Sequence, residues 1–159
     1  VPGGDYGAFI ERRTGRPLAE GDILDLEGRV LGRHRGAARY TLGQRRGLGV
    51  ARNEPLYVAA KSMESNTVTL GPESSLYSAR LSARGINLIA CESLERPLRV
   101  TAKTRYLQKE EPARAEQTGE DSLTVVFDRP QRAITPGQAV VLYDGDIVVG
   151  GGTISQAGN

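Results

Sequence analysis

The stretch Val140-Val-Leu-Tyr-Asp-Gly-Asp-Ile-Val-Val149 carries the clearest structural signal in the sequence. Asp-Gly is a preferred pair in two-residue β-hairpin turns, which need positive φ angles that few other residues tolerate. Runs of apolar and β-branched residues of strand length stand on both sides of this pair. The stretch therefore predicts two antiparallel strands, 139–143 and 147–154, that turn at Asp144 and Gly145.

Further short strands are predicted before this hairpin, at 88–91, 98–106 and 122–127, with a turn at Thr135-Pro-Gly137. The alternation within 98–106 predicts a buried face (Val100, Ala102, Thr104) and a basic face (Thr101, Lys103, Arg105). Regularly spaced short strands favour a small closed or nearly closed barrel, because closure removes unpaired strand edges. The glycines 150–152 are expected to permit a bulge or a close backbone contact within the last strand.

The first half of the chain predicts a different arrangement. Apolar residues at helical spacing indicate a short helix over 5–13, with Asp5 as a candidate N-cap. Two apolar runs around a Glu-Gly turn within 21–34 predict a β-hairpin, and 55–60 with 66–71 predict a second strand pair. The first β unit closes near 76–81, so we expect two domains, 1–77 and 78–159. The fold class is mainly β: a small β-rich domain followed by a six-stranded type of barrel.

The charge is unevenly distributed, although its formal net value is only +2. Residues 28–53 contain seven arginines and no acid, and 96–109 form a second basic stretch without an acid. Arg supplies 18 of the 21 basic residues, and its guanidinium suits bidentate phosphate contacts and stacking on bases. A solvated surface is one reading of each stretch, and a polyanion partner is the other.

A self-contained active site is not expected. The single His34 has no distinctive neighbours and is assigned a structural or surface role, and Cys91 is expected to be a small buried filler in a strand. One His and one Cys make a poor metal site, so neither a metal-ligand nor a catalytic residue is predicted. No run approaches the length of a membrane span, and no signal peptide is present, so the chain is interpreted as cytoplasmic.

The most specific motif is Tyr40-Thr-Leu-Gly-Gln-Arg-Arg-Gly-Leu-Gly49, preceded by Gly32-Arg-His-Arg-Gly36. It resembles the signature of the bacterial tRNA-specific 2-thiouridylases. The resemblance continues in order along nearly the whole chain, through Pro2-Gly-Gly-Asp-Tyr6, Lys103-Thr-Arg-Tyr106, Phe127-Asp-Arg-Pro-Gln-Arg-Ala-Ile-Thr-Pro-Gly-Gln138 and Gly150-Gly-Gly152.

The resemblance implies a small middle domain and a C-terminal barrel similar to the second domain of translational elongation factors. Enzymes of this family use ATP, with magnesium, to adenylate the wobble uridine of tRNA, and then insert sulfur from a cysteine persulfide. The ATP-binding loop and the reactive cysteines belong to an N-terminal domain whose motifs this chain lacks. The chain, which opens at Val-Pro-Gly-Gly, is therefore interpreted as part of a longer enzyme, without a cofactor and inactive alone.

The resemblance also places tRNA contacts on Arg105, Tyr106 and Gln138. The alternation of the strand agrees for Arg105, whose side chain falls on the basic face. Tyr106 has the opposite parity, so a buried core tyrosine is the alternative there. For Gln138 the alternative is a turn residue that caps backbone groups.

The density of Gln44, Arg45 and Arg46 between glycines motivates a separate hypothesis. These residues lie near the tRNA or at a contact with the catalytic domain, and shape the site without reacting. The alternative is a glycine-rich connection whose arginines bond local carbonyl groups.

Two functions from different classes follow. The leading one is the tRNA-holding part of a sulfurtransferase that acts on tRNA of glutamate, glutamine or lysine type and receives sulfur from a sulfur-relay protein or a cysteine desulfurase. The second is a stand-alone β-barrel module for protein contacts. A separate hydrolase fails, because neither a general base nor a metal site is apparent.

Overall fold

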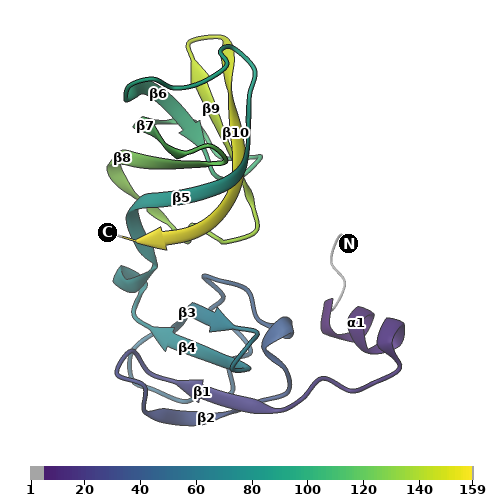
Figure 1. Ribbon diagram of the computed structural model, residues 1–159. Helices are drawn as coiled ribbons and strands as arrows, with labels where there is room; N and C mark the ends of the chain where they lie inside the picture. The colour runs from purple at the N-terminus through teal and green to yellow at the C-terminus, as the bar shows by residue number, and fades with distance from the viewer. Residues whose placement is uncertain (1–5, 159) are drawn as a thin grey trace. The chain divides into compact units, whose positions relative to one another are not determined.

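The computed structural model of the chain describes residues 6–158, which divide into two compact units between Leu76 and Tyr77. The first unit carries one helix and a four-stranded sheet, and the second is a closed six-stranded barrel (Figure 1). The mainly β fold predicted from the sequence is therefore confirmed. The described residues include no helix long and apolar enough to cross a membrane.

The sheet of the first unit consists of β1 (Gly21–Leu24), β2 (Val30–His34), β3 (Tyr57–Ser62) and β4 (Thr67–Gly71), in the order β2-β1-β4-β3. The pairs β1–β2 and β3–β4 are antiparallel, as the two predicted hairpins require. Parallel pairing of β1 with β4 joins the two hairpins into one sheet. Two short 3-10 turns, η1 (Ala37–Arg39) and η2 (Glu73–Leu76), follow β2 and β4.

The predicted helix is present as α1 (Tyr6–Thr14). It ends where Gly15 takes a positive φ of 66° and donates its N–H to the carbonyl of Glu11, a glycine C-cap. Asp5, the candidate N-cap, lies outside the described residues.

The core of the first unit is small, with six buried apolar side chains at its centre. His34 belongs to the same unit, where its ring is buried and both of its nitrogens have partners. Nδ1 accepts the N–H of Gly36 at 2.9 Å, and Nε2 lies 2.9 Å from the carbonyl oxygen of Asn66. A structural role for His34 is thus confirmed.

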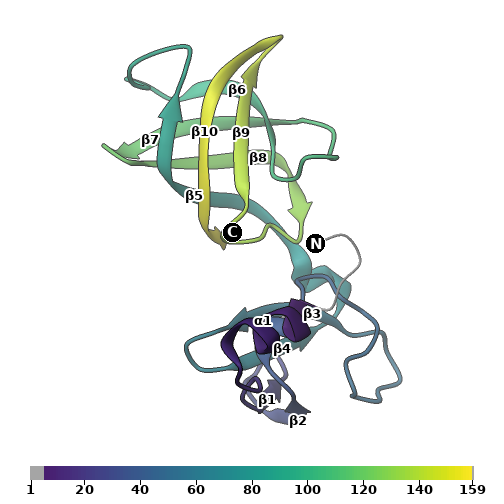
Figure 2. The same cartoon turned by 90° about the vertical axis from the view of Figure 1, so that its right-hand side faces the viewer.

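The barrel is formed by β5 (Tyr77–Leu88), β6 (Leu98–Lys103), β7 (Glu111–Gly119), β8 (Ser122–Arg132), β9 (Ala139–Asp144) and β10 (Ile147–Gly158). Its closed order is β10-β5-β8-β7-β6-β9, and every neighbouring pair is antiparallel (Figure 2). The hairpin that turns at Asp144 and Gly145 is confirmed as β9–β10. Fourteen buried apolar side chains from all six strands and from Ile134 fill the interior.

Two predictions about these strands are wrong, and one strand is missing from the sequence prediction. The strand expected at 88–91 is the longer β5, which ends at Leu88. The strand expected at 98–106 stops at Lys103, and β7 was not predicted at all. The reason is composition: β7 points only Ala113 and Ala115 into the barrel, so its apolar signal is weak, and pairing with β6 and β8 holds it in place.

Candidate nucleic-acid interface

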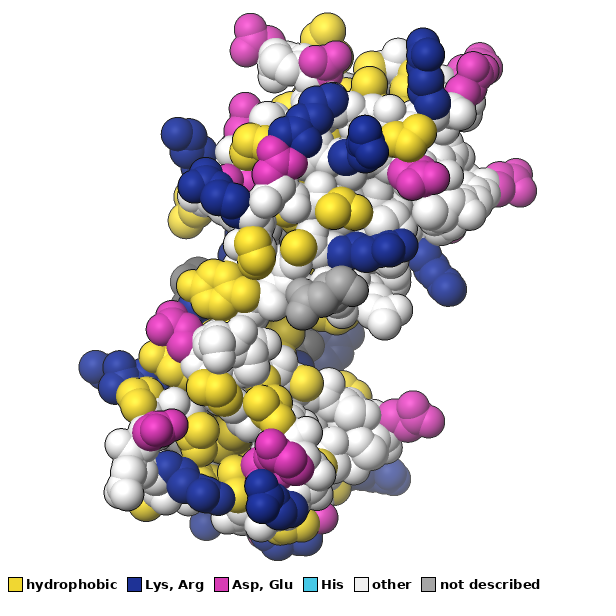
Figure 3. Space-filling model, turned by 90° about the vertical axis from the view of Figure 1, so that its left-hand side faces the viewer, with side chains coloured by type: hydrophobic (Ala, Val, Ile, Leu, Met, Phe, Trp, Pro, Cys, Tyr) yellow, Lys and Arg dark blue, Asp and Glu magenta, His cyan; other side chains and the backbone are white. Residues whose placement is uncertain are grey.

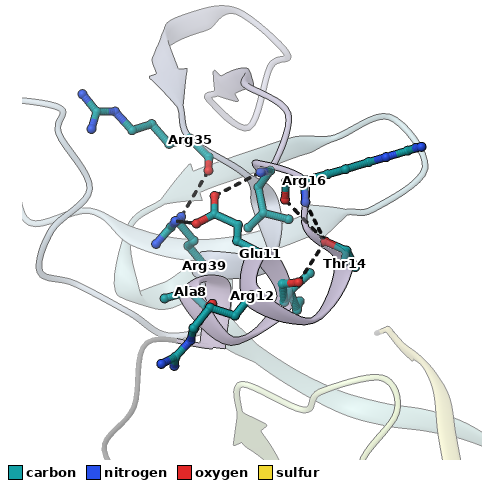
Figure 4. A network of polar contacts seen from close by, with 9 residues as sticks. Ala8, Glu11, Arg12, Thr14, Arg16, Arg35 and Arg39 are labelled. Carbon is teal, nitrogen blue, oxygen red and sulfur yellow. Dashed lines mark hydrogen bonds and ion pairs between the residues drawn. The ribbon is translucent and has the colours of Figure 1, made fainter.

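The arginines of the basic stretch 28–53 fall into two groups. Three of the seven are paired with carboxylates: Arg29 with Asp25 and Glu27, Arg33 with Asp22, and Arg39 with Glu11. Arg39 ties α1 to the rest of its unit, because it also donates to the carbonyl of Arg35 (Figure 4). The other four have no carboxylate partner among the described residues: Arg35, Arg45, Arg46 and Arg52.

The side chain of Gln44 forms hydrogen bonds within its own loop, whereas the side chains of Arg45 and Arg46 form none there. Its side-chain oxygen accepts the N–H of Thr41 at 3.0 Å, and its amide nitrogen donates to the carbonyl of Arg46 at 2.9 Å. Arg45 and Arg46 are exposed, and neither guanidinium donates a hydrogen bond to the described part of the chain. In this loop it is therefore the side chain of Gln44, and not that of either arginine, that bonds a local carbonyl group. Both arginine side chains are exposed to solvent.

The second basic stretch, 96–109, also has part of its charge offset. Arg99 and Asp128 form an ion pair on the outer face of the barrel, with one N–O distance of 2.7 Å. The side-chain hydrogen bond from Arg99 lowers the pKa of Asp128, so this carboxylate stays charged at neutral pH. Lys103 lies over the ring of Tyr143 at 5.6 Å. Arg96, Arg105 and Lys109 remain exposed cations without a carboxylate partner in the described residues.

Arg105 does not lie on the basic face of a strand, as the sequence predicted. It follows the end of β6, in a turn over 104–108, and its side chain is exposed. One guanidinium nitrogen donates to the carbonyl of Ala133 at 3.0 Å. A guanidinium has five N–H donors, so this bond orients Arg105 and leaves other donors available to a ligand.

Tyr106 and Leu107 form an exposed apolar tip on this turn. Their exposed fractions are 94% and 93%, the highest of the large apolar residues. The alternative that Tyr106 is a buried core residue is therefore wrong. Its strand parity does not apply, because the chain leaves the sheet after Lys103 and no longer alternates.

A chain of buried and half-buried polar groups supports the tip from below. Thr104 donates to the side-chain oxygen of Gln108 at 2.9 Å, and Gln108 donates to that of Gln131 at 2.8 Å. Gln131 in turn donates to the carbonyl of Arg129 at 2.8 Å. Because Thr104 and Gln131 are buried, these bonds are shielded from water and hold the turn against the end of β8.

Gln138 lies on the segment that Arg105 contacts. The carbonyl of Ala133 accepts bonds from both Arg105 and Thr135, and the backbone N–H of Gln138 donates to the carbonyl of Thr135. The side chain of Gln138 is exposed and bonds no described residue. Gln138 therefore follows a turn, as the alternative expected, but its side chain caps no backbone group in the described part of the chain. Arg105, Tyr106 and Gln138 thus lie on two adjoining segments of the barrel.

A hollow of about 600 Å³ opens beside this turn, and three arginines line it: Arg105, Arg129 and Arg132. Leu107 and Gln108 form part of the wall, and Glu111 is the one acidic residue lining it. Sequence reasoning missed Leu107 and Arg129. The only available signal was their position beside the Arg-Tyr pair and within the Asp-Arg-Pro motif, because neither belongs to a periodic pattern.

Side chains with catalytic potential are few. Among residues 6–158 no three His, Cys, Asp or Glu side chains gather as a metal site would require. Cys91 is half-buried and follows β5, so its predicted place as a buried filler in a strand is wrong. On the face drawn in Figure 3, basic and acidic side chains of the described residues are interspersed, which suits local contacts rather than one broad field.

Comparison with known proteins gives consistent matches for both units. A family model described as "tRNA methyl transferase PRC-barrel domain" matches residues 7–72, and one described as "Aminomethyltransferase beta-barrel domain" matches residues 78–154. The chain is 51% identical over 150 residues to the tRNA-specific 2-thiouridylase MnmA of Acetivibrio thermocellus, covering 94% of the chain and 42% of that relative. It is 44% identical over 157 residues to the tRNA-specific 2-thiouridylase MnmA of Clostridioides difficile, covering 99% of the chain and 44% of the relative. The chain thus spans less than half the length of the relatives that it matches.

Proposed function

Because the chain belongs to the tRNA-specific 2-thiouridylase family, of which it carries the middle and C-terminal domains, we propose that it holds tRNA for a longer enzyme. Residues 1–77 serve as the middle, adaptor domain, and residues 78–159 as the RNA-binding barrel. The family is enzymatic, and the relatives' names state that they act on tRNA. The ligand proposed for this chain is accordingly a tRNA of glutamate, glutamine or lysine type.

The observation that carries the proposal is the supported turn with Arg105 and Tyr106. An exposed aromatic ring beside a guanidinium can stack on an unpaired base while the cation contacts its phosphate. The buried bonds through Gln108 and Gln131 hold the turn before RNA arrives, so less conformational entropy is lost on binding. Gln138, with an exposed amide on the adjoining segment, can donate to and accept from a base edge or a ribose.

The chemistry of sulfur transfer is assigned to the remainder of the longer enzyme. ATP with magnesium, the reactive cysteines and the contact with a sulfur-relay protein or cysteine desulfurase belong there, and the present chain alone is expected to have no thiolation activity. A tRNA ligand places this function in the cytoplasm. Gln44 supports the loop that carries Arg45 and Arg46, and these two arginines face RNA or the catalytic domain.

A salt-dependent binding titration tests the proposal. The chain and its Arg105→Ala variant are titrated with glutamate, glutamine or lysine tRNA at low and moderate salt, with Arg96→Ala as the control for losing one exposed charge on the same barrel. Loss of Arg105 should weaken binding by about fivefold or more and reduce the log–log salt slope by about 0.7–0.9. Arg96→Ala should change both quantities much less.

Two results would count against the proposal. Equal losses in the two variants would mean that only net charge matters and that the Arg105 turn is not the contact. The absence of binding to any of these tRNAs at low salt would favour a module that docks to protein.

A further inference from the structure

The segment 45–54 has an unusual set of unpaired backbone donors. It lies between η1 and β3 and contains no proline before Pro55, so each of its residues carries an N–H group. None of these N–H groups donates a hydrogen bond to any residue within 6–158. Most of the segment is exposed, so these N–H groups are accessible to water or to an acceptor from outside the chain.

The segment is nevertheless held in a defined path. Leu48 is buried in the core of the first unit, and Val50 and Leu56 pack against the same core. At its start, Gln44 bonds Thr41 and Arg46 through its side chain, and bonds the N–H of Val58 through its carbonyl at 2.9 Å. Long loops without secondary structure are uncommon in compact domains and are often functional when ordered. The anchored apolar side chains fix where the donors point.

Glycines shape the surface between these anchors. Gly47 and Gly49 have φ angles of 72° and 70°, a conformation that side chains rarely adopt. A Cβ atom at Gly49 would meet no atom within 4 Å, so the space on that side of its Cα is open. Successive N–H groups in such turns form concavities that bind anions.

Two arginines of this segment line the same hollow as the glycines. Arg45 and Arg52 line one hollow of about 500 Å³ together with Gly47, Leu48, Gly49, Val50 and Ala51. Both belong to the group that lacks a carboxylate partner, and Glu54 is the one acid lining the hollow. Arg46, between them in sequence, does not line it. The hollow therefore combines two guanidinium groups with a stretch of free amide donors.

We propose that Arg45, Arg52 and the amides of 47–51 form a second RNA contact, which takes a backbone phosphate of the bound tRNA. This inference rests on the proposed function, since it takes tRNA as the ligand, and adds a site on the first unit to the one on the barrel. A phosphate presents several acceptor oxygens and a negative charge, which match guanidinium forks and N–H donors. A contact of this kind positions RNA without reading its sequence.

The test compares two double variants that remove the same charge from the first unit. In Arg45→Gln/Arg52→Gln the hollow loses both guanidinium groups, whereas Arg13→Gln/Arg35→Gln removes two exposed arginines of the same unit that do not line it. For the full chain and lysine tRNA, the first variant should bind about tenfold more weakly, with a log–log salt slope smaller by at least about 0.7. The control variant should bind within about threefold of the unaltered chain.

Amide NMR spectra provide a second readout that does not depend on a substitution. Addition of a short RNA stem–loop to the unaltered chain should shift the amide signals of Gly47, Gly49 and Ala51. Tight tRNA binding with equal affinities in both double variants, or with these amides unshifted, would overturn the site and leave the proposed function standing. If the unaltered chain binds no tRNA, the proposed function fails and this inference fails with it.

Discussion

Gln131 shows how one buried side chain can support the candidate interface from below. It is buried at the end of β8, accepts a bond from Gln108 and donates to the carbonyl of Arg129. The tip formed by Tyr106 and Leu107 rests on this arrangement. At the scale of single residues, the position of the exposed ring therefore depends on a buried amide.

Replacing Gln131 by leucine removes both bonds and leaves the Gln108 amide without its partner. We expect a loss of about 1–3 kcal/mol in the free energy of unfolding, and weaker tRNA binding because the turn is no longer fixed. Chemical denaturation and the tRNA titration measure the two effects.

Gln117→Leu is the matched control for this variant. Gln117 accepts the N–H of Leu94 at 2.9 Å and lies towards the other end of β7 from Glu111. Its loss should lower stability similarly and leave tRNA affinity unchanged. If both variants bind tRNA equally, the support under the Tyr106 turn has no role in RNA binding.

Among the strands, β10 depends most on glycine. Gly150 has a φ of 153°, and a Cβ atom there would overlap the carbonyl of Asn87 on β5. The register of β10 also shifts against β9 between Val148 and Gly150. The expectation of a bulge or close backbone contact at 150–152 is confirmed, and it lets the strand pair with both neighbours as the barrel closes.

Gly150→Ala should therefore destabilise the barrel. The added methyl group forces the β5 backbone away and strains a conformation that alanine disfavours, at a cost of about 1–3 kcal/mol or more. Thermal or chemical unfolding followed by circular dichroism measures the loss. Gly158→Ala, in the same strand but with no atom within 4 Å of the added Cβ, should stay within about 0.5 kcal/mol of the unaltered chain. Equal stability of the two variants would contradict a close contact at Gly150.

On the scale of the whole molecule, the two units differ in how much apolar surface they bury. The barrel has fourteen buried apolar side chains in its core and no unpaired strand edge, whereas the first unit has six in its core and an open four-stranded sheet. A small core is marginal for independent stability. We therefore expect the barrel to be more stable than the first unit when each is isolated.

Residues 77–159 produced separately should fold as the same barrel. Their amide NMR spectrum should overlay on the corresponding signals of the full chain, because each strand finds its partners within this unit. A collapsed spectrum of an unfolded chain would show that the barrel needs the first unit. The spectrum of residues 1–76 alone is the useful comparison, with broader signals and weaker protection from exchange expected.

The sequence by itself determined the local features with strong short-range signals. Asp144-Gly145 set the β9–β10 turn, the alternation of Val100 and Ala102 set the buried face of β6, and the order of motifs indicated the family. These features depend on neighbouring residues or on the alternation of side chains along a strand, and both can be recognised from the sequence alone. The expected role of Gly150, Gly151 and Gly152 in β10 has the same basis.

Only the tertiary structure decided where strands end and which charges remain free. The chain leaves the sheet after Lys103 because the Thr104–Gln108–Gln131 bonds, which join segments distant in sequence, replace the ladder there. Likewise Arg39 is tied to Glu11, while Arg45 and Arg52 line one hollow. The amino-acid composition does not distinguish these arginines from one another. Whether an arginine has a carboxylate partner depends on residues distant in sequence, which come together only once the chain has folded.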